Sequence, residues 1–121
     1  NKFYHPAGHN QAHEYRFPFP DCEFDFVYLC SVFTHMKKDE MTNYLREIAR
    51  VLKPAGRCVI TFCLLNSESI ELMAVETTEP LASGFNRMNF RFEFDGYRAL
   101  EKDVPEAVIA YDEDVVRKLY A

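Results

Sequence analysis

The sequence predicts an α/β fold, because two apolar strands flank one amphipathic helix. Residues Phe24–Cys30 become a continuous apolar run after Asp25, which is typical of a parallel strand covered on both faces. Residues Asp39–Lys53 repeat apolar side chains at a spacing of three and four, as a helix with one buried face does. Residues Arg57–Leu65 are again apolar, so the three segments form a βαβ unit with parallel strands and a right-handed crossover.

The predicted helix ends at a proline and a glycine. Pro54 cannot continue a helix, because its ring blocks the preceding turn. Gly56 tolerates the left-handed turn that often follows a helix. A reversal into the second strand is therefore expected here, whereas residues 1–23 contain three prolines and predict an irregular entry segment.

The second half of the sequence predicts a hairpin and two further helices. Residues 66–75 can begin a helix, and residues 76–84 have the composition of a loop. Residues 88–94 alternate between apolar and polar, and Asp95-Gly96 favours a tight turn before Tyr97–Leu100, so we expect an antiparallel hairpin with a buried phenylalanine face. Asp112 is expected to cap a last helix whose apolar stripe comprises Val115, Val116, Leu119 and Tyr120.

Composition excludes several classes of protein. A chain of 121 residues is long enough for one domain with one core. A net charge of −5 offers no basic stripe for nucleic acid, and the apolar runs fall short of the roughly 20 residues that span a membrane. The four cysteines show no CxxC pairing, and three lie in predicted buried strands, so we expect reduced thiols and a cytoplasmic location. They are Cys22, Cys30, Cys58 and Cys63.

Two segments of the chain form a motif pair. RFPFPDCEFDFVYLCSVFTHM covers residues 16–36, and YLREIARVLKPAGRCVITF covers residues 44–62. Together they resemble the second half of class I S-adenosylmethionine-dependent methyltransferases. The resemblance implies a partial, doubly wound, Rossmann-like sheet in which residues 24–30 and 57–65 are the fourth and fifth strands. It also implies that residues 66–111, which contain the antiparallel hairpin, are an insertion within a single partial domain.

The same resemblance implies a site for S-adenosylmethionine. Cys30, Ser31 and Val32 match the end of the fourth strand, where the family offers backbone groups to the methionine part of the donor. Phe17 and Pro18 match a loop that borders the adenine ring, although simple core packing of residues 17–19 is an equal alternative. In open α/β sheets ligands do bind beyond the carboxyl ends of the strands.

Two features of the family are missing from these residues. The stretch His13–Arg16 lacks the aspartate that many relatives carry before the proline-phenylalanine pair, and the glycine-rich GxGxG turn is absent. The chain therefore matches the C-terminal half of the enzyme, and we expect it to bind the donor poorly by itself. Its uncovered strand edges predict self-association.

His35 is the one candidate general base near the expected cleft, and the alternative is that it caps or packs the start of the helix. His5, His9 and His13 recur every four residues, but the nearby proline and glycine favour a solvated loop over a metal site, and no metal is predicted. Cys30 beside His35 suggests a thiol nucleophile, yet its apolar strand favours a buried, inert cysteine.

The sequence thus favours an enzyme that moves a methyl group from S-adenosylmethionine to an oxygen, nitrogen or carbon atom. The acceptor, whether a small molecule, a lipid or a sugar, does not follow from the sequence. A non-catalytic interaction module with a degenerate methyltransferase fold is the rival interpretation. Half of a nucleotide-binding oxidoreductase is a third, and it predicts a phosphate-binding glycine turn that these residues also lack.

Overall fold

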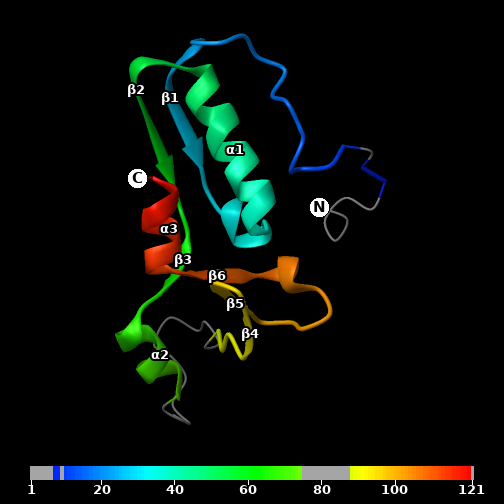
Figure 1. Cartoon of the computed structure of the whole chain (residues 1–121), viewed down its shortest axis with the longest axis vertical. Coiled ribbons are helices and arrows are strands. Elements are labelled where there is room, and N and C mark those ends of the chain that lie inside the picture. The colour runs from blue at the N-terminus through cyan, green and yellow to red at the C-terminus, as the bar shows by residue number, and fades with distance from the viewer. Residues whose placement is uncertain (1–6, 9, 75–87, 121) are drawn as a thin grey trace. The chain divides into compact units, whose positions relative to one another are not determined.

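A computed structural model describes residues 7–8, 10–74 and 88–120 of the chain (Figure 1). The chain divides into two compact units, residues 1–62 and residues 63–121. The predicted loop 76–84 and two of the three recurring histidines, His5 and His9, lie outside the described residues.

The first unit contains the predicted βαβ motif. Strand β1 spans Phe24–Leu29, helix α1 spans Lys38–Val51 and strand β2 spans Leu52–Ile60. The two strands pair in parallel, with Tyr28 opposite Val59, which confirms the predicted direction. Figure 1 shows α1 running alongside both strands. The helix begins where the Glu40 carboxylate accepts a hydrogen bond from the Lys37 backbone N–H at 2.8 Å, which satisfies a donor at the helix start.

The junction between α1 and β2 differs from the prediction in detail. The helix ends at Val51, not Lys53, and the residue with a left-handed backbone is Ala55, with φ of 65°, not Gly56. Gly56 is needed for a different reason. A Cβ atom there would lie 2.8 Å from the Lys53 carbonyl oxygen, so only glycine fits this close approach of the backbone.

Apolar side chains between α1 and its neighbours form the core of this unit. Met41, Ile48 and Val51 on α1 are almost fully buried. Phe33 is fully buried, and its ring meets Tyr44 and Phe62 at centroid distances of 6.5 and 5.4 Å. Burying side chains of this size stabilises the fold by about 1.5–3 kcal/mol each.

The prediction that β1 is covered on both faces is wrong. Phe26 and Tyr28 are 56% and 60% exposed, and Val59, which pairs with Tyr28, is 47% exposed. Paired residues of parallel strands point to the same side of a sheet, so these three side chains share one exposed apolar face. The continuous apolar run of β1 therefore does not mean that both faces of the strand are buried. Helix α1 covers one face, and the face with Phe26 and Tyr28 is exposed.

The second unit contains a four-stranded sheet in the order β3-β6-β5-β4. Its strands are β3 (Cys63–Leu65), β4 (Phe92–Phe94), β5 (Tyr97–Ala99) and β6 (Ile109–Asp112). β3 and β6 are parallel, and the other two pairs are antiparallel. The predicted single strand Arg57–Leu65 is wrong, because it is divided between β2 and β3, which belong to different sheets. The break follows Thr61, whose N–H donates to Leu29, the last residue of β1, at 3.0 Å.

The hairpin of β4 and β5 turns at Asp95-Gly96, and Gly96 has the positive φ, 78°, that such a turn requires. Of the expected phenylalanine face, Phe90 is buried and Phe92 and Phe94 are half-buried. β6 was not predicted, although Ile109, Ala110 and Tyr111 are among the most buried of the described residues of this unit. The interpretation of the hairpin as an insertion in a larger methyltransferase sheet stays a prediction.

Two helices follow the parallel strands β3 and β6. Helix α2 spans Ser67–Ala74, and it begins with reciprocal hydrogen bonds between Asn66 and Ser69 of 2.8 and 2.9 Å. Helix α3 spans Glu113–Leu119 and follows Asp112 as predicted, but the Asp112 side chain makes no capping hydrogen bond. Of the predicted stripe only Val116 is buried, and Tyr120 is exposed. No helix among the described residues is long and apolar enough to cross a membrane.

Candidate functional site

The carboxyl ends of β1 and β2 are tied together by a serine and a threonine. Ser31 follows β1, and its N–H donates to the Thr61 hydroxyl oxygen at 2.9 Å. Ser31 also has a φ of 54°, a left-handed conformation that costs about 1–2 kcal/mol for a residue other than glycine. Such strain is concentrated at functional sites, and Ser31 is one of the residues that the sequence assigned to donor binding.

Cys30 is exposed, so the prediction of a buried cysteine is wrong. The Cys30 side chain lies on the same side as the exposed Tyr28 side chain, because residues two apart in an extended chain point to one side. Hydrogen bonds lower the pKa of the Cys30 thiol, with Tyr28 as the largest cause and Ser31 and Thr61 next. The same interaction raises the pKa of Tyr28. Of the other cysteines in predicted buried strands, Cys58 and Cys63 are half-buried.

Val32 leads directly into a short 3₁₀ turn, Phe33–His35. The Val32 carbonyl accepts a hydrogen bond from the His35 N–H at 3.0 Å, and both residues are half-buried. His35 thus lies between the end of β1 and the start of α1 at Lys38. This placement is compatible with both interpretations of His35, and its role as a general base stays a prediction.

Phe17 and Pro18 lie in the segment that precedes β1. The Phe17 ring packs edge-on against Tyr44 of α1, with ring centroids 5.0 Å apart, whereas Pro18 is exposed. Tyr44 also contacts Phe33, so it connects this segment with the turn that follows β1. The contacts of Phe17 are those of a packed core residue, and its proposed contact with adenine is untested.

A row of polar residues on α1 holds this segment in place. We call Asn43, Glu47 and Arg50 the polar ladder. The Asn43 side-chain amide donates to the carbonyls of Ala12 and Tyr15, each at 2.9 Å. Asn43 is 4% exposed and Glu47 is 7% exposed, so these polar groups need such partners.

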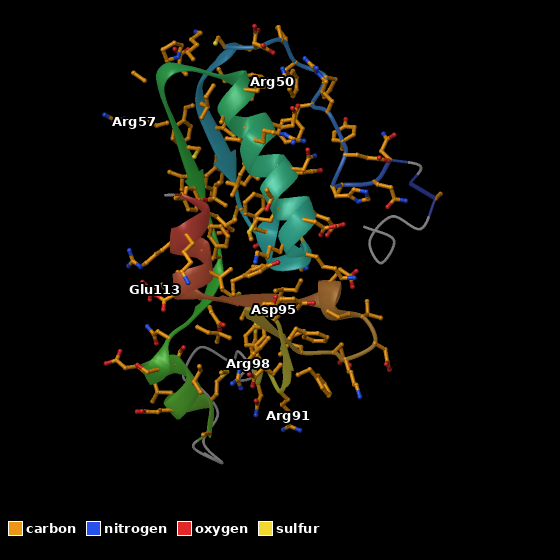
Figure 2. All side chains as sticks on the ribbon, viewed as in Figure 1. Arg50, Arg57, Arg91, Asp95, Arg98 and Glu113 are labelled. Carbon is orange, nitrogen blue, oxygen red and sulfur yellow. The ribbon has the colours of Figure 1, made fainter. Side chains whose placement is uncertain are left out.

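Glu47 and Arg50 continue the ladder toward the following residues. The Glu47 carboxylate accepts a hydrogen bond from the Phe17 N–H at 2.8 Å and forms an ion pair with Arg50 at 2.6 Å. Arg50 also donates to the carbonyls of Phe17 and Phe19 and pairs with Asp21 at 2.7 Å. Figure 2 shows Arg50 at the end of α1 beside this segment. The guanidinium, helped by the Phe17 N–H, lowers the pKa of Glu47 to about 2.

The polar ladder was missed at the level of the sequence. Its signal is the spacing of four and three between its members, which places them on one side of a helix, next to the apolar side. Polar residues at this spacing are usually solvated, and nothing in the sequence distinguishes the buried row from an exposed one. Within the described residues, no group of three or more histidine, cysteine, aspartate or glutamate side chains could hold a metal ion.

Residues 4–60 match a family model described as a methyltransferase domain. Over these residues the chain is similar to class I S-adenosylmethionine-dependent methyltransferase domains. The match covers β1, α1 and β2, together with the polar ladder and every site residue that the sequence predicted. It ends at residue 60, before β3, so the sheet of the second unit lies outside it. No solved structure matches the chain.

Proposed function

We propose that this chain supplies part of the donor site of an enzyme that transfers a methyl group from S-adenosylmethionine. The observation that carries the proposal is the pair of parallel strand ends at Ser31 and Thr61, which lie within and directly after the methyltransferase segment. Ligands of open α/β sheets bind beyond such ends. The fold unit present is mixed α/β, as this family requires.

In this proposal the backbone of Cys30, Ser31 and Val32 faces the methionine part of the donor. The positive φ of Ser31 turns the chain away from the strand direction. Because the Ser31 N–H donates to the Thr61 hydroxyl, the proposal assigns the donor contact to the other backbone groups of residues 30–32. Phe17 and Pro18 border the adenine ring, and His35 removes a proton from the acceptor. Methyl transfer from a sulfonium is an in-line displacement, so positioning of the two reactants supplies much of the rate.

We further propose that the chain is one partial domain of a cytoplasmic enzyme, with residues 66–111 as an insertion that shapes acceptor choice. The glycine-rich turn that the family uses for the donor is absent from these residues. The 121-residue chain should therefore not bind S-adenosylmethionine measurably by itself. Calorimetry with the chain and the donor tests this expectation, and micromolar binding would place the donor site elsewhere than in the family.

Substitution of Ser31 tests the site in the full-length protein that contains this chain. Ser31→Trp should abolish donor binding, because the indole would fill the space beyond β1. Ser31→Ala is the matched control and should retain binding, since the proposal uses the backbone and not the hydroxyl. Equal dissociation constants for S-adenosylmethionine in the tryptophan variant and the wild type would remove Ser31 from the site.

An interaction module is the second candidate, and the exposed apolar face of Phe26, Tyr28 and Val59 favours it. Contiguous exposed apolar side chains often mark contacts between proteins. In this alternative the chain associates with itself through the edges of its strands. Light scattering of the 121-residue chain distinguishes a monomer from a self-associated form. A monomer at high concentration would argue against self-association.

A further inference from the structure

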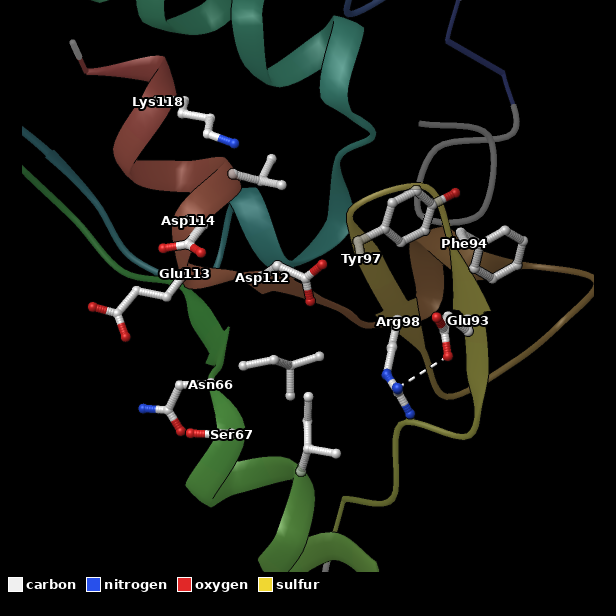
Figure 3. A pocket seen from close by; sticks show the side chains of 13 residues that line it. Asn66, Ser67, Glu93, Phe94, Tyr97, Arg98, Asp112, Glu113, Asp114 and Lys118 are labelled. Carbon is white, nitrogen blue, oxygen red and sulfur yellow. Dashed lines mark ion pairs between the residues drawn. The ribbon is translucent and has the colours of Figure 1, made fainter.

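The second unit contains an open pocket of about 710 Å³ that the methyltransferase match does not reach (Figure 3). It lies where β3 and β6 end, because Asn66 follows β3 and Asp112 is the last residue of β6. These strands are parallel, with Leu65 paired to Asp112, so their carboxyl ends meet at one edge of the sheet. The pocket thus has the location and the size that ligand sites of α/β sheets have.

One half-buried carboxylate in this pocket is without a partner. Asp112 makes no side-chain cap to α3, and no hydrogen bond or ion pair joins its carboxylate to another described residue. Figure 3 shows the carboxylate pointing toward the side of the pocket that carries Tyr97 and Arg98, while Glu113 points away. A carboxylate that is half-buried and unpaired is a ready acceptor for a cationic group.

The other charges of the pocket are mostly compensated. Arg98 forms an ion pair with Glu93 at 2.9 Å, and Glu113 pairs with Arg117 on the next turn of α3. Asp114 and Lys118 also line the pocket, but both are exposed and no ion pair joins them. Asp112 is therefore the half-buried carboxylate of the lining that has no ion pair, and the negative charge of the lining favours a cationic ligand.

The remaining walls are suited to an apolar ligand body. Leu65, Ile70 and Val115 provide aliphatic surface. Tyr97 and Phe94 form a stacked pair whose rings are 4.8 Å apart and 8° from parallel. A flat or aromatic group can lie against such surfaces while its amine reaches the carboxylate.

We propose that this pocket binds an organic amine with an aromatic or flat apolar body, through an ion pair with Asp112. The proposal is independent of methyl transfer, because it concerns only residues of the second unit. It assigns a ligand site to a part of the chain that the family match leaves without a role.

Phenethylamine is a suitable probe, and its binding to the ¹⁵N-labelled 121-residue chain can be followed by NMR. We expect saturable shifts of the backbone amides of Asn66, Ser67 and Asp112. Phenylpropionate, which has a carboxylate in place of the amine, should give no such shifts. This comparison uses the wild type alone and does not depend on the folding of any variant.

Asp112→Asn should raise the dissociation constant for phenethylamine by about tenfold or more, which is the usual effect of losing a charged hydrogen bond. Asp103→Asn, at an exposed residue outside the pocket lining, is the matched control and should leave it unchanged. Equal binding of the amine and the acid, absence of saturable shifts at the pocket, or unchanged binding in Asp112→Asn would each overturn the proposal.

Discussion

The chain contains two pairs of parallel strands, and they are built in different ways. β1 and β2 are joined by one helix, α1. Pro54 and Gly56 lie just after the end of that helix, in the first part of β2. β3 and β6 are separated by more than forty residues, and the hairpin β4–β5 comes between them in sequence. Both pairs carry a candidate ligand site at their carboxyl ends. Local connection makes the first pair visible in the sequence, whereas the second pair depends on long-range contacts.

The largest expected effect comes from the core of the first unit. Phe33→Ala removes a fully buried ring that contacts Tyr44 and Phe62, and we expect a loss of about 3–5 kcal/mol in the free energy of unfolding. Amide exchange can follow β1 and β6 separately. Protection should fall along β1 and persist along β6 if the two strand pairs are independent. An equal loss in both would show that they unfold together.

The polar ladder should make the stability of the first unit depend on pH. The pKa of Glu47 is lowered to about 2 in the folded state from an ordinary value of 4.5, so ionised Glu47 stabilises the fold above that ordinary value. This contribution is lost as the pH falls from about 5 to 2. Urea unfolding across this range should show a steeper decline for the wild type than for Glu47→Gln. Asp39→Asn, an exposed change on α1, serves as the control and should keep the wild-type slope.

Two substitutions at the junction between α1 and β2 should have smaller and opposite effects on stability. Gly56→Ala should destabilise the first unit, because the added Cβ would lie 2.8 Å from the Lys53 carbonyl oxygen. Ala55→Gly should relieve the strain of a left-handed alanine and stabilise the fold by up to about 1 kcal/mol. Thermal denaturation compares the two variants. A stabilised Gly56→Ala would contradict the close approach of the Lys53 carbonyl, and a destabilised Ala55→Gly would contradict the assignment of strain to Ala55.

Much of the first strand pair was predictable because its signals are local. The apolar spacing of residues 39–53 and the proline that follows identify α1 to within two residues at each end. The exposure of Tyr28 was not predictable, since an apolar run does not say how many helices cover a strand. β6 was missed because four residues are too few for a periodic pattern to stand out.

The candidate donor site was predictable only in part. Ser31 was singled out by resemblance to the family, while its left-handed backbone and its bond to Thr61 depend on the folded chain. The polar ladder and the pocket at Asp112 were not predictable, because the sequence does not show which polar residues become buried in the folded chain. The sequence thus shows the resemblance to methyltransferases, and the contacts show how the candidate residues are arranged.

We propose that S-adenosylmethionine lies beyond the carboxyl ends of β1 and β2. Ultraviolet cross-linking of radiolabelled S-adenosylmethionine to the full-length protein, followed by peptide mapping, tests this position and requires no knowledge of the acceptor. We expect label on peptides that contain residues 17–18 or residues 30–32, and competition by unlabelled donor. Label that is competed by the donor but maps only to residues 63–121 would contradict it.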